Sequence, residues 1–168
     1  LNDLYASIND SKLSSDKIEI EELTESFIKK YQSKIATLSS ENLNEAISDY
    51  QTINQKLGKL YSYVSLTFSI NTDKPDFGKK YQEIRELGSI IFSKLVFFEL
   101  EIMNLDDKTS KKYLSDNNLS YWKPWLRKIF QRKPFQLSND LEQFIAEKGP
   151  SGRGAWVRLF DESSSDLR

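Results

Sequence analysis

The chain has 168 residues, of which 29 % are charged and 38 % hydrophobic, a composition typical of one globular domain with its own core. It holds 24 Lys and Arg against 25 Asp and Glu, so its net charge is −1. The absence of His and Cys excludes every catalytic or metal site that needs an imidazole or a thiol. No apolar run is long enough to predict a membrane span.

Charge is distributed unevenly along the chain. Residues 1–107 hold 12 Lys and Arg against 18 Asp and Glu, a net charge of −6, whereas residues 108–168 hold 12 against 7, a net charge of +5. Such a dipole suits an oppositely charged partner or an anion, although solvated faces of opposite bias are the more ordinary interpretation. The basic and aromatic residues of 122–133 would suit single-stranded nucleic acid, but their aromatics follow helical core spacing. We therefore expect neither nucleic acid nor a membrane as a partner.

Long helices are predicted over about residues 16–105. The first is expected to be capped at 14–16 and carries an apolar stripe at steps of three and four from Ile20 to Leu38. The second covers about residues 41–70, with a similar stripe from Leu43 to Phe68. Stripes of this period predict helices that bury one face each.

The third long helix has the most regular stripe, which runs from Phe77 to Leu105 after Pro75 in the first turn. Alternating steps of four and three favour nearly antiparallel neighbours at a shallow crossing angle. Gly88 lies on this stripe, and we expect the close approach of a neighbouring backbone to compensate for its low helix propensity. A second apolar face predicts a central helix that is buried on two sides; it comprises Ile90, Phe92, Val96 and Phe97.

Shorter helices are predicted over residues 108–162. Their segments are 108–114, 119–130 with Pro124 near the start, a helix capped by Ser138 or Asn139 and ended by Gly149-Pro150, and 155–160. Residues 163–168 are expected to be a linker or a truncated end. No strand alternation is found. The predicted fold class is therefore all-α: one domain, 1–162, with a bundle of long antiparallel helices followed by several shorter helices.

Short motifs are spread in order over nearly the whole chain. They are Asn2-Asp3-Leu4-Tyr5, Phe27 with Tyr31 and Ile35-Ala36-Leu38, Leu60-Tyr61-Ser62-Tyr63, Phe97-Phe98-Glu99-Leu100-Glu101, Lys133-Pro134-Phe135-Gln136-Leu137-Ser138 and Ala155-Trp156-Val157-Arg158-Leu159-Phe160. Together they resemble the N-terminal part of the oligoendopeptidase F group of thimet-oligopeptidase-like zinc metallopeptidases.

The resemblance implies a helical N-terminal region that packs on a catalytic region, with a deep peptide channel between them and zinc at its floor. This chain would be one wall and lid of that channel in a cytoplasmic zinc endopeptidase that cleaves oligopeptides. The family's H-E-x-x-H motif, in which two imidazoles bind zinc and Glu activates water, matches no position here. We therefore expect no catalytic residue, metal ligand or cofactor in this chain, and no peptidase activity from it alone.

The partners implied by the resemblance are the catalytic domain of the same polypeptide and oligopeptide substrates. Without that catalytic domain, we expect an exposed apolar patch and self-association, through the second face of the third helix or the cluster at 122–130. Two alternatives stay open: a free-standing helical protein-interaction module, and a structural bundle with no peptide role.

Four residues are candidates for channel or interdomain contacts. Glu99 and Glu101 are carboxylates in an apolar run, where a charge needs a partner or solvent. Lying two residues apart on a helix, they point in different directions and cannot act as a dyad. Pairing with Lys, Arg or Tyr hydroxyls of other helices is the alternative to a channel role. Tyr61 and Tyr63, near Tyr81, would offer hydroxyls to a peptide unless they belong to the core.

Overall fold

The computed structural model describes residues 1 and 3–165. This part of the chain contains seven α-helices, three short 3-10 helices and no strand, which confirms the all-α class. The α-helices are α1 (Ser11–Tyr31), α2 (Ser40–Ser69), α3 (Pro75–Met103), α4 (Asp107–Ser115), α5 (Lys123–Arg132), α6 (Asn139–Lys148) and α7 (Arg153–Ser165). The 3-10 helices are η1 (Ile35–Thr37), η2 (Asn117–Trp122) and η3 (Lys133–Phe135).

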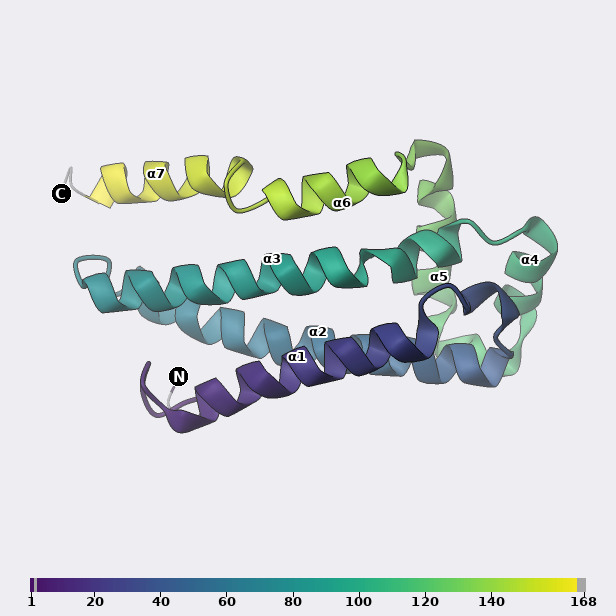
Figure 1. The fold of residues 1–168 in the computed structure, drawn as a ribbon, viewed down its shortest axis with the longest axis horizontal. Helices are drawn as coiled ribbons and strands as arrows, with labels where there is room; N and C mark the ends of the chain where they lie inside the picture. The colour runs from purple at the N-terminus through teal and green to yellow at the C-terminus, as the bar shows by residue number, and fades with distance from the viewer. Residues whose placement is uncertain (2, 166–168) are drawn as a thin grey trace.

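The long helices α1, α2 and α3 lie side by side along the longest axis of the molecule, each antiparallel to the one before (Figure 1). The short helices α4 and α5 close one end of this bundle. The chain then returns along α3 as α6 and α7, which lie end to end in a separate layer. We call α6 and α7 with their connection the arm (residues 139–165).

The core fills the space between the three long helices. Most positions of the predicted stripes on α2 and α3 are buried, as the spacing requires. Aromatic rings pack at its centre: the Phe98 ring lies 5.1 Å from that of Phe27 and 5.0 Å from that of Tyr50, measured between centroids. The residues that carry the core on these helices include Ile20, Phe27, Leu43, Ile47, Ile53, Leu60, Ile84, Ile91, Leu95, Phe98 and Ile102.

The first helix differs from its predicted bounds at both ends. It begins at Ser11 rather than after Ser14, because the Asp10 carboxylate caps it by accepting the Lys12 N–H. It ends at Tyr31, since Ser33 adopts a left-handed conformation with φ of 63° that no helix continues through. The predicted single stripe up to Leu38 is therefore wrong, although Ile35 is still buried, from η1.

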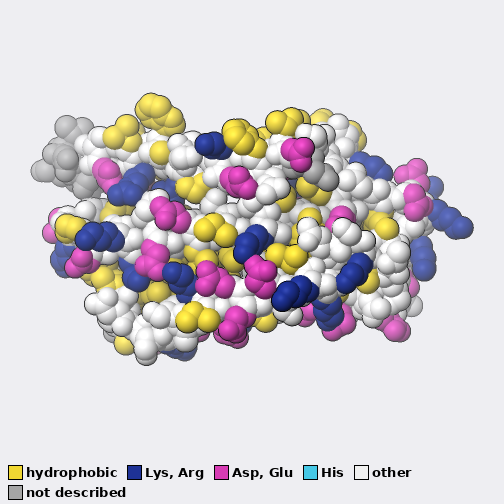
Figure 2. All heavy atoms as spheres, in the orientation of Figure 1, with side chains coloured by type: hydrophobic (Ala, Val, Ile, Leu, Met, Phe, Trp, Pro, Cys, Tyr) yellow, Lys and Arg dark blue, Asp and Glu magenta, His cyan; other side chains and the backbone are white. Residues whose placement is uncertain are grey.

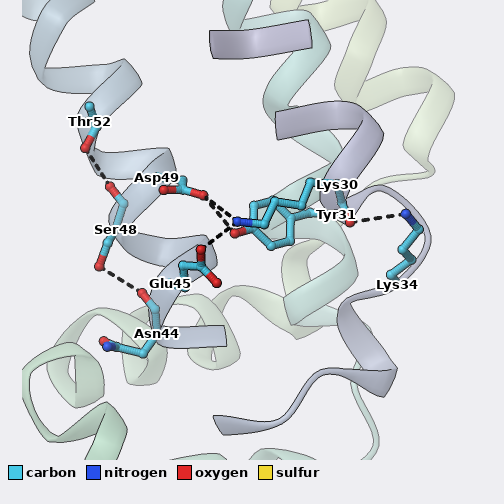
Figure 3. A network of polar contacts seen from close by, with 8 residues as sticks. All are labelled: Lys30, Tyr31, Lys34, Asn44, Glu45, Ser48, Asp49 and Thr52. Carbon is cyan, nitrogen blue, oxygen red and sulfur yellow. Dashed lines mark hydrogen bonds and ion pairs between the residues drawn. The ribbon is translucent and has the colours of Figure 1, made fainter. Parts of the chain in front are cut away.

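A polar network joins the end of α1 to α2 (Figure 3). The Tyr31 hydroxyl donates to Asp49 at 2.8 Å, and the Lys30 ammonium lies 2.7 Å from Glu45. Burial, and to a lesser degree the hydrogen bond to Asp49, raises the pKa of Tyr31 to about 12. The phenol thus stays protonated and keeps donating, which fixes the register of α1 on α2.

The second face of α3 is only partly buried, unlike the predicted burial on two sides. Val96 and Phe97 pack against the core, whereas Ile90 and Phe92 are 54 % and 52 % exposed, as the expected exposed patch requires. The cluster at 122–130, by contrast, differs from the expectation of an exposed patch: its members are buried or packed against the core. Seven of the seventeen large apolar side chains that are exposed in the described part of the chain lie on the arm, visible along the upper edge of Figure 2. They include Leu141, Phe144, Ile145, Trp156, Val157, Leu159 and Phe160.

The other short helices agree with their predicted places. Pro124 lies in the first turn of α5 and so opens that helix rather than kinking it. Ser138 is the N-cap residue of α6, which ends before Gly149. Helix α7 continues to Ser165, so the linker or truncated end predicted from residue 163 is wrong for residues 163–165; residues 166–168 lie outside the described part. Among the described helices, none combines the length and apolar character that crossing a membrane requires.

Glu101→Ala should lower the free energy of unfolding by about 1–3 kcal/mol. The Glu101 carboxylate accepts the backbone N–H of Ser33 at 2.7 Å and that of Ile35 at 3.4 Å, so its loss leaves the strained turn without its acceptor. Urea unfolding measures the change. Glu22→Ala, at an exposed position of α1, is the control and should stay within about half a kcal/mol of the parent chain. Equal urea midpoints for the two variants would contradict the stabilisation of the turn by Glu101.

Candidate functional site: a groove between the bundle and the arm

A groove runs between α2 and α3 on one side and the arm on the other. It consists of three cavities of 380, 460 and 590 Å³ that follow one another and all include Gly149 in their lining. Phe92 is shared by the first two cavities, and Tyr61 and Arg85 by the last two. We call this continuous feature the arm groove.

The groove is long because one face of α2 lines it turn after turn. Its lining residues on α2 extend from Tyr50 to Ser69, which corresponds to about 28 Å at 1.5 Å per residue. An extended peptide advances about 3.3 Å per residue, so roughly eight residues would fit along this length. The contributing residues of α2 are Tyr50, Asn54, Leu57, Gly58, Tyr61, Ser65, Phe68 and Ser69.

Two helix-interior glycines lie in the middle cavity. A Cβ atom at Gly58 or at Gly88 would meet no atom within 4 Å. The predicted close approach of a neighbouring backbone at Gly88 is therefore wrong: the position faces open space. Apolar side chains surround this slot, among them Leu57, Ile84, Phe92 and Pro150.

The arm is attached to α3 chiefly through polar groups beside this groove. The Ser89 hydroxyl donates to the Ala146 carbonyl at 3.2 Å, and the Ser93 hydroxyl to Glu147 at 3.0 Å. Further along, the Arg158 guanidinium donates to the Gln82 amide oxygen at 3.1 Å. These hydrogen bonds join the arm to α3, while the large apolar side chains of the arm stay exposed.

Glu99 lies at one end of the groove and is paired within the chain. Its carboxylate accepts the Tyr50 hydroxyl at 3.2 Å and lies 3.0 Å from the Arg132 guanidinium. Burial, followed by the charge of Glu99, raises the pKa of Tyr50 well above its usual range. The phenol therefore remains a donor, and the pairing with Arg and Tyr expected as the alternative for Glu99 is present.

The other end of the groove carries tyrosine hydroxyls and a guanidinium. The hydroxyls of Tyr61 and Tyr81 lie 3.3 Å apart, and the Arg85 guanidinium carbon is 5.5 Å from the centre of the Tyr81 ring. Burial, and then the hydrogen bond with Tyr61, raises the pKa of Tyr81 to about 12. The Tyr81 phenol is thus a neutral hydrogen-bonding group at neutral pH.

The four candidate residues fall in two different environments. Glu99 and Tyr61 line the groove, whereas Glu101 faces the turn at Ser33, and Tyr63 is buried with its ring centroid 5.0 Å from that of Tyr5. Glu99 and Glu101 lie two residues apart on one helix, as do Tyr61 and Tyr63, so the two members of each pair point to different sides. Sequence reasoning missed Arg85 and Phe92 as groove residues, and took the glycine in α3 as a packing feature.

The chain supplies no fitting ligand set for zinc. It has no His and no Cys, and the described residues contain no group of three or more Asp and Glu placed to hold a metal ion. Any zinc site of a larger protein would have to be formed by other residues.

Comparison with known proteins finds similarity to oligoendopeptidase F. A family model described as Oligopeptidase F matches residues 101–168. The Oligoendopeptidase F homolog of Mycoplasma genitalium is 28 % identical over 170 residues, covering 98 % of this chain and 27 % of that protein. The crystal structure of oligoendopeptidase-F from Enterococcus faecium shares the fold, with a TM-score of 0.76, 19 % identity and coverage of 83 % of this chain and 27 % of that one.

These comparisons confirm the resemblance predicted from the sequence: the chain is similar to the N-terminal part of oligoendopeptidase F. It spans about a quarter of the length of the curated relative that it matches.

Gly88→Ala should raise the free energy of unfolding by up to about 1 kcal/mol, because the added methyl improves helix propensity and meets no atom. Gly154→Ala is the matched contrast: its methyl would overlap the Arg85 guanidinium and lie 2.9 Å from the Gly149 carbonyl oxygen, so stability should fall by about 1 kcal/mol or more. Urea midpoints compare the two variants. Destabilisation by Gly88→Ala would show that this position is occupied in solution.

Proposed function

We propose that this chain is the non-catalytic N-terminal domain of a zinc metallo-oligopeptidase and forms one wall and lid of its peptide channel. The arm groove is the observation that carries the proposal. It is about as long as an extended peptide of roughly eight residues, apolar at its centre and polar at both ends. A groove of this length and character would suit a single extended peptide.

The division of labour follows from the residues present. Hydrolysis would use zinc held by a catalytic domain of the same polypeptide, because this chain has no imidazole or thiol ligand. The groove would orient the peptide through the apolar surface around Phe92 and hydrogen-bonding groups such as the Tyr61 hydroxyl. Binding along many residues can be used to position a scissile bond elsewhere in the channel.

The arm supplies the surface for the catalytic domain. Helix α7 has apolar residues around its circumference, yet none of its described side chains is buried. A helix of this kind is normally covered on both sides. Here one side faces the groove, while Trp156 and Phe160, 73 % and 71 % exposed, remain outside. We place the catalytic domain against that outer side, where closing the lid would exclude water from the bound peptide.

A cytoplasmic location is part of the same proposal. The absence of Cys suits a reducing compartment, where disulfides do not stabilise proteins.

A free-standing protein-interaction module is the second candidate function. The exposed apolar side chains of the arm favour it, since they would equally suit a separate protein partner. It differs from the first candidate in requiring no affinity of the groove for oligopeptides.

Peptide binding by the 168-residue chain tests the role of the groove. A fluorescein-labelled decapeptide with mixed apolar and polar side chains should bind saturably, and Phe92→Glu should weaken binding at least ten-fold by placing a charge in the apolar centre. Leu66→Glu is the control, because Leu66 is equally exposed, at 52 %, but does not line the groove. Fluorescence anisotropy gives the affinities, and equal affinities for the two variants would exclude the groove as the binding surface.

Association of the arm tests the placement of the catalytic domain. The isolated chain should form concentration-dependent dimers and bind a hydrophobic dye, and the double variant Trp156→Ser, Phe160→Ser should reduce both. Sedimentation measures the association. A separately expressed catalytic portion should displace the dimers and gain peptidase activity from the chain. A strictly monomeric chain that never restores activity would favour the self-sufficient module.

A further inference from the structure

Arg85 is a half-buried cation at the junction of the arm groove with the cavity on the other side of α7. The residue lines three cavities: the 460 and 590 Å³ cavities of the groove and the 890 Å³ cavity between α3 and α7. Gly154 makes room for its guanidinium, since a methyl group at that position would overlap it. The fold thus holds this cation against the first turn of α7.

The guanidinium has no anionic partner within the described part of the chain. Nine ion pairs are formed there, and none involves Arg85; nor does its guanidinium donate a hydrogen bond to any described residue. Nearby Arg158, by contrast, is paired with Glu162 at 2.6 Å and with Gln82. A planar guanidinium with five donors is well suited to a carboxylate, which accepts two parallel hydrogen bonds.

The apolar slot over the two glycines lies directly beside this cation. Arg85 and Gly88 are three residues apart on α3, so they lie about 5–6 Å from each other on one side of the helix. Both line the 460 Å³ cavity with Gly58. A ligand that fills the slot with a bulky apolar group and presents a carboxylate to Arg85 must carry both groups close together. In a peptide, the C-terminal residue has that combination.

We propose that Arg85 binds the C-terminal carboxylate of an oligopeptide whose last side chain is apolar and fills the slot at Gly58 and Gly88. The Tyr61 hydroxyl, in the same cavity, is a second donor for that carboxylate. The inference rests on the proposed function, because it assigns a direction to the peptide in the arm groove. In the proposed oligopeptidase, this contact would select peptides by their C-terminal residue.

Peptide binding by the 168-residue chain and by two variants tests the assignment. Fluorescein-labelled decapeptides of one sequence are compared by anisotropy with a free C-terminal Phe, with the same Phe as its amide, and with a free C-terminal Gly. The free acid ending in Phe should bind about ten-fold more tightly than its amide, and Arg85→Gln should abolish that difference. Gly88→Leu, which fills the slot, should reduce the affinity for Phe to that for Gly.

Arg127→Gln is the matched control, because Arg127 is an exposed cation of α5 outside the groove and should leave all affinities unchanged. Circular dichroism verifies that each variant keeps its helical fold. Equal binding of acid and amide by the parent chain would overturn the role of Arg85 while leaving the groove as a peptide site. Failure of every peptide to bind would overturn the proposed function together with this inference.

Discussion

The packing of α3 is the constraint on which the rest of the structure depends. On one side its apolar seam, from Ile84 to Ile102, is closed by α1 and α2, and each buried Leu, Ile or Phe there contributes about 1.5–3 kcal/mol. On the other side the arm is joined to α3 by hydrogen bonds from Ser89 and Ser93, with cavities beside them. The closed side makes the domain stable, and the open side leaves a groove that its own side chains do not fill.

Carboxylates on α3 stabilise the fold in two different ways. Glu101 accepts the backbone N–H groups of a turn in which Ser33 is strained, so a local cost is offset by charge-assisted hydrogen bonds. Glu99 joins the hydroxyl of Tyr50 to the guanidinium of Arg132 and so connects α2, α3 and α5 at one end of the groove. Neither group is left uncompensated in its apolar surroundings.

Buried and exposed apolar side chains gather in different layers of the molecule. The bundle of α1, α2 and α3 buries most of its large apolar side chains wholly or in part, whereas the arm exposes most of its own (Figures 1 and 2). A layer of this kind is expected to be completed by a further surface. The relative that this chain matches is much longer, and the chain spans about a quarter of it.

The sequence by itself determined the helical class and the long stripes of α2 and α3, because helical periodicity and capping residues are local signals. The order of its short motifs gave the resemblance to oligoendopeptidase F. Its lack of His and Cys also excluded a zinc site of the family's kind. Only the tertiary structure decided that Gly88 faces a slot, that Glu99 and Tyr61 share a groove and that Arg85 forms no ion pair with any described carboxylate. These properties depend on where the arm lies relative to α3, and a few long-range hydrogen bonds fix that distance without any periodic pattern in the sequence.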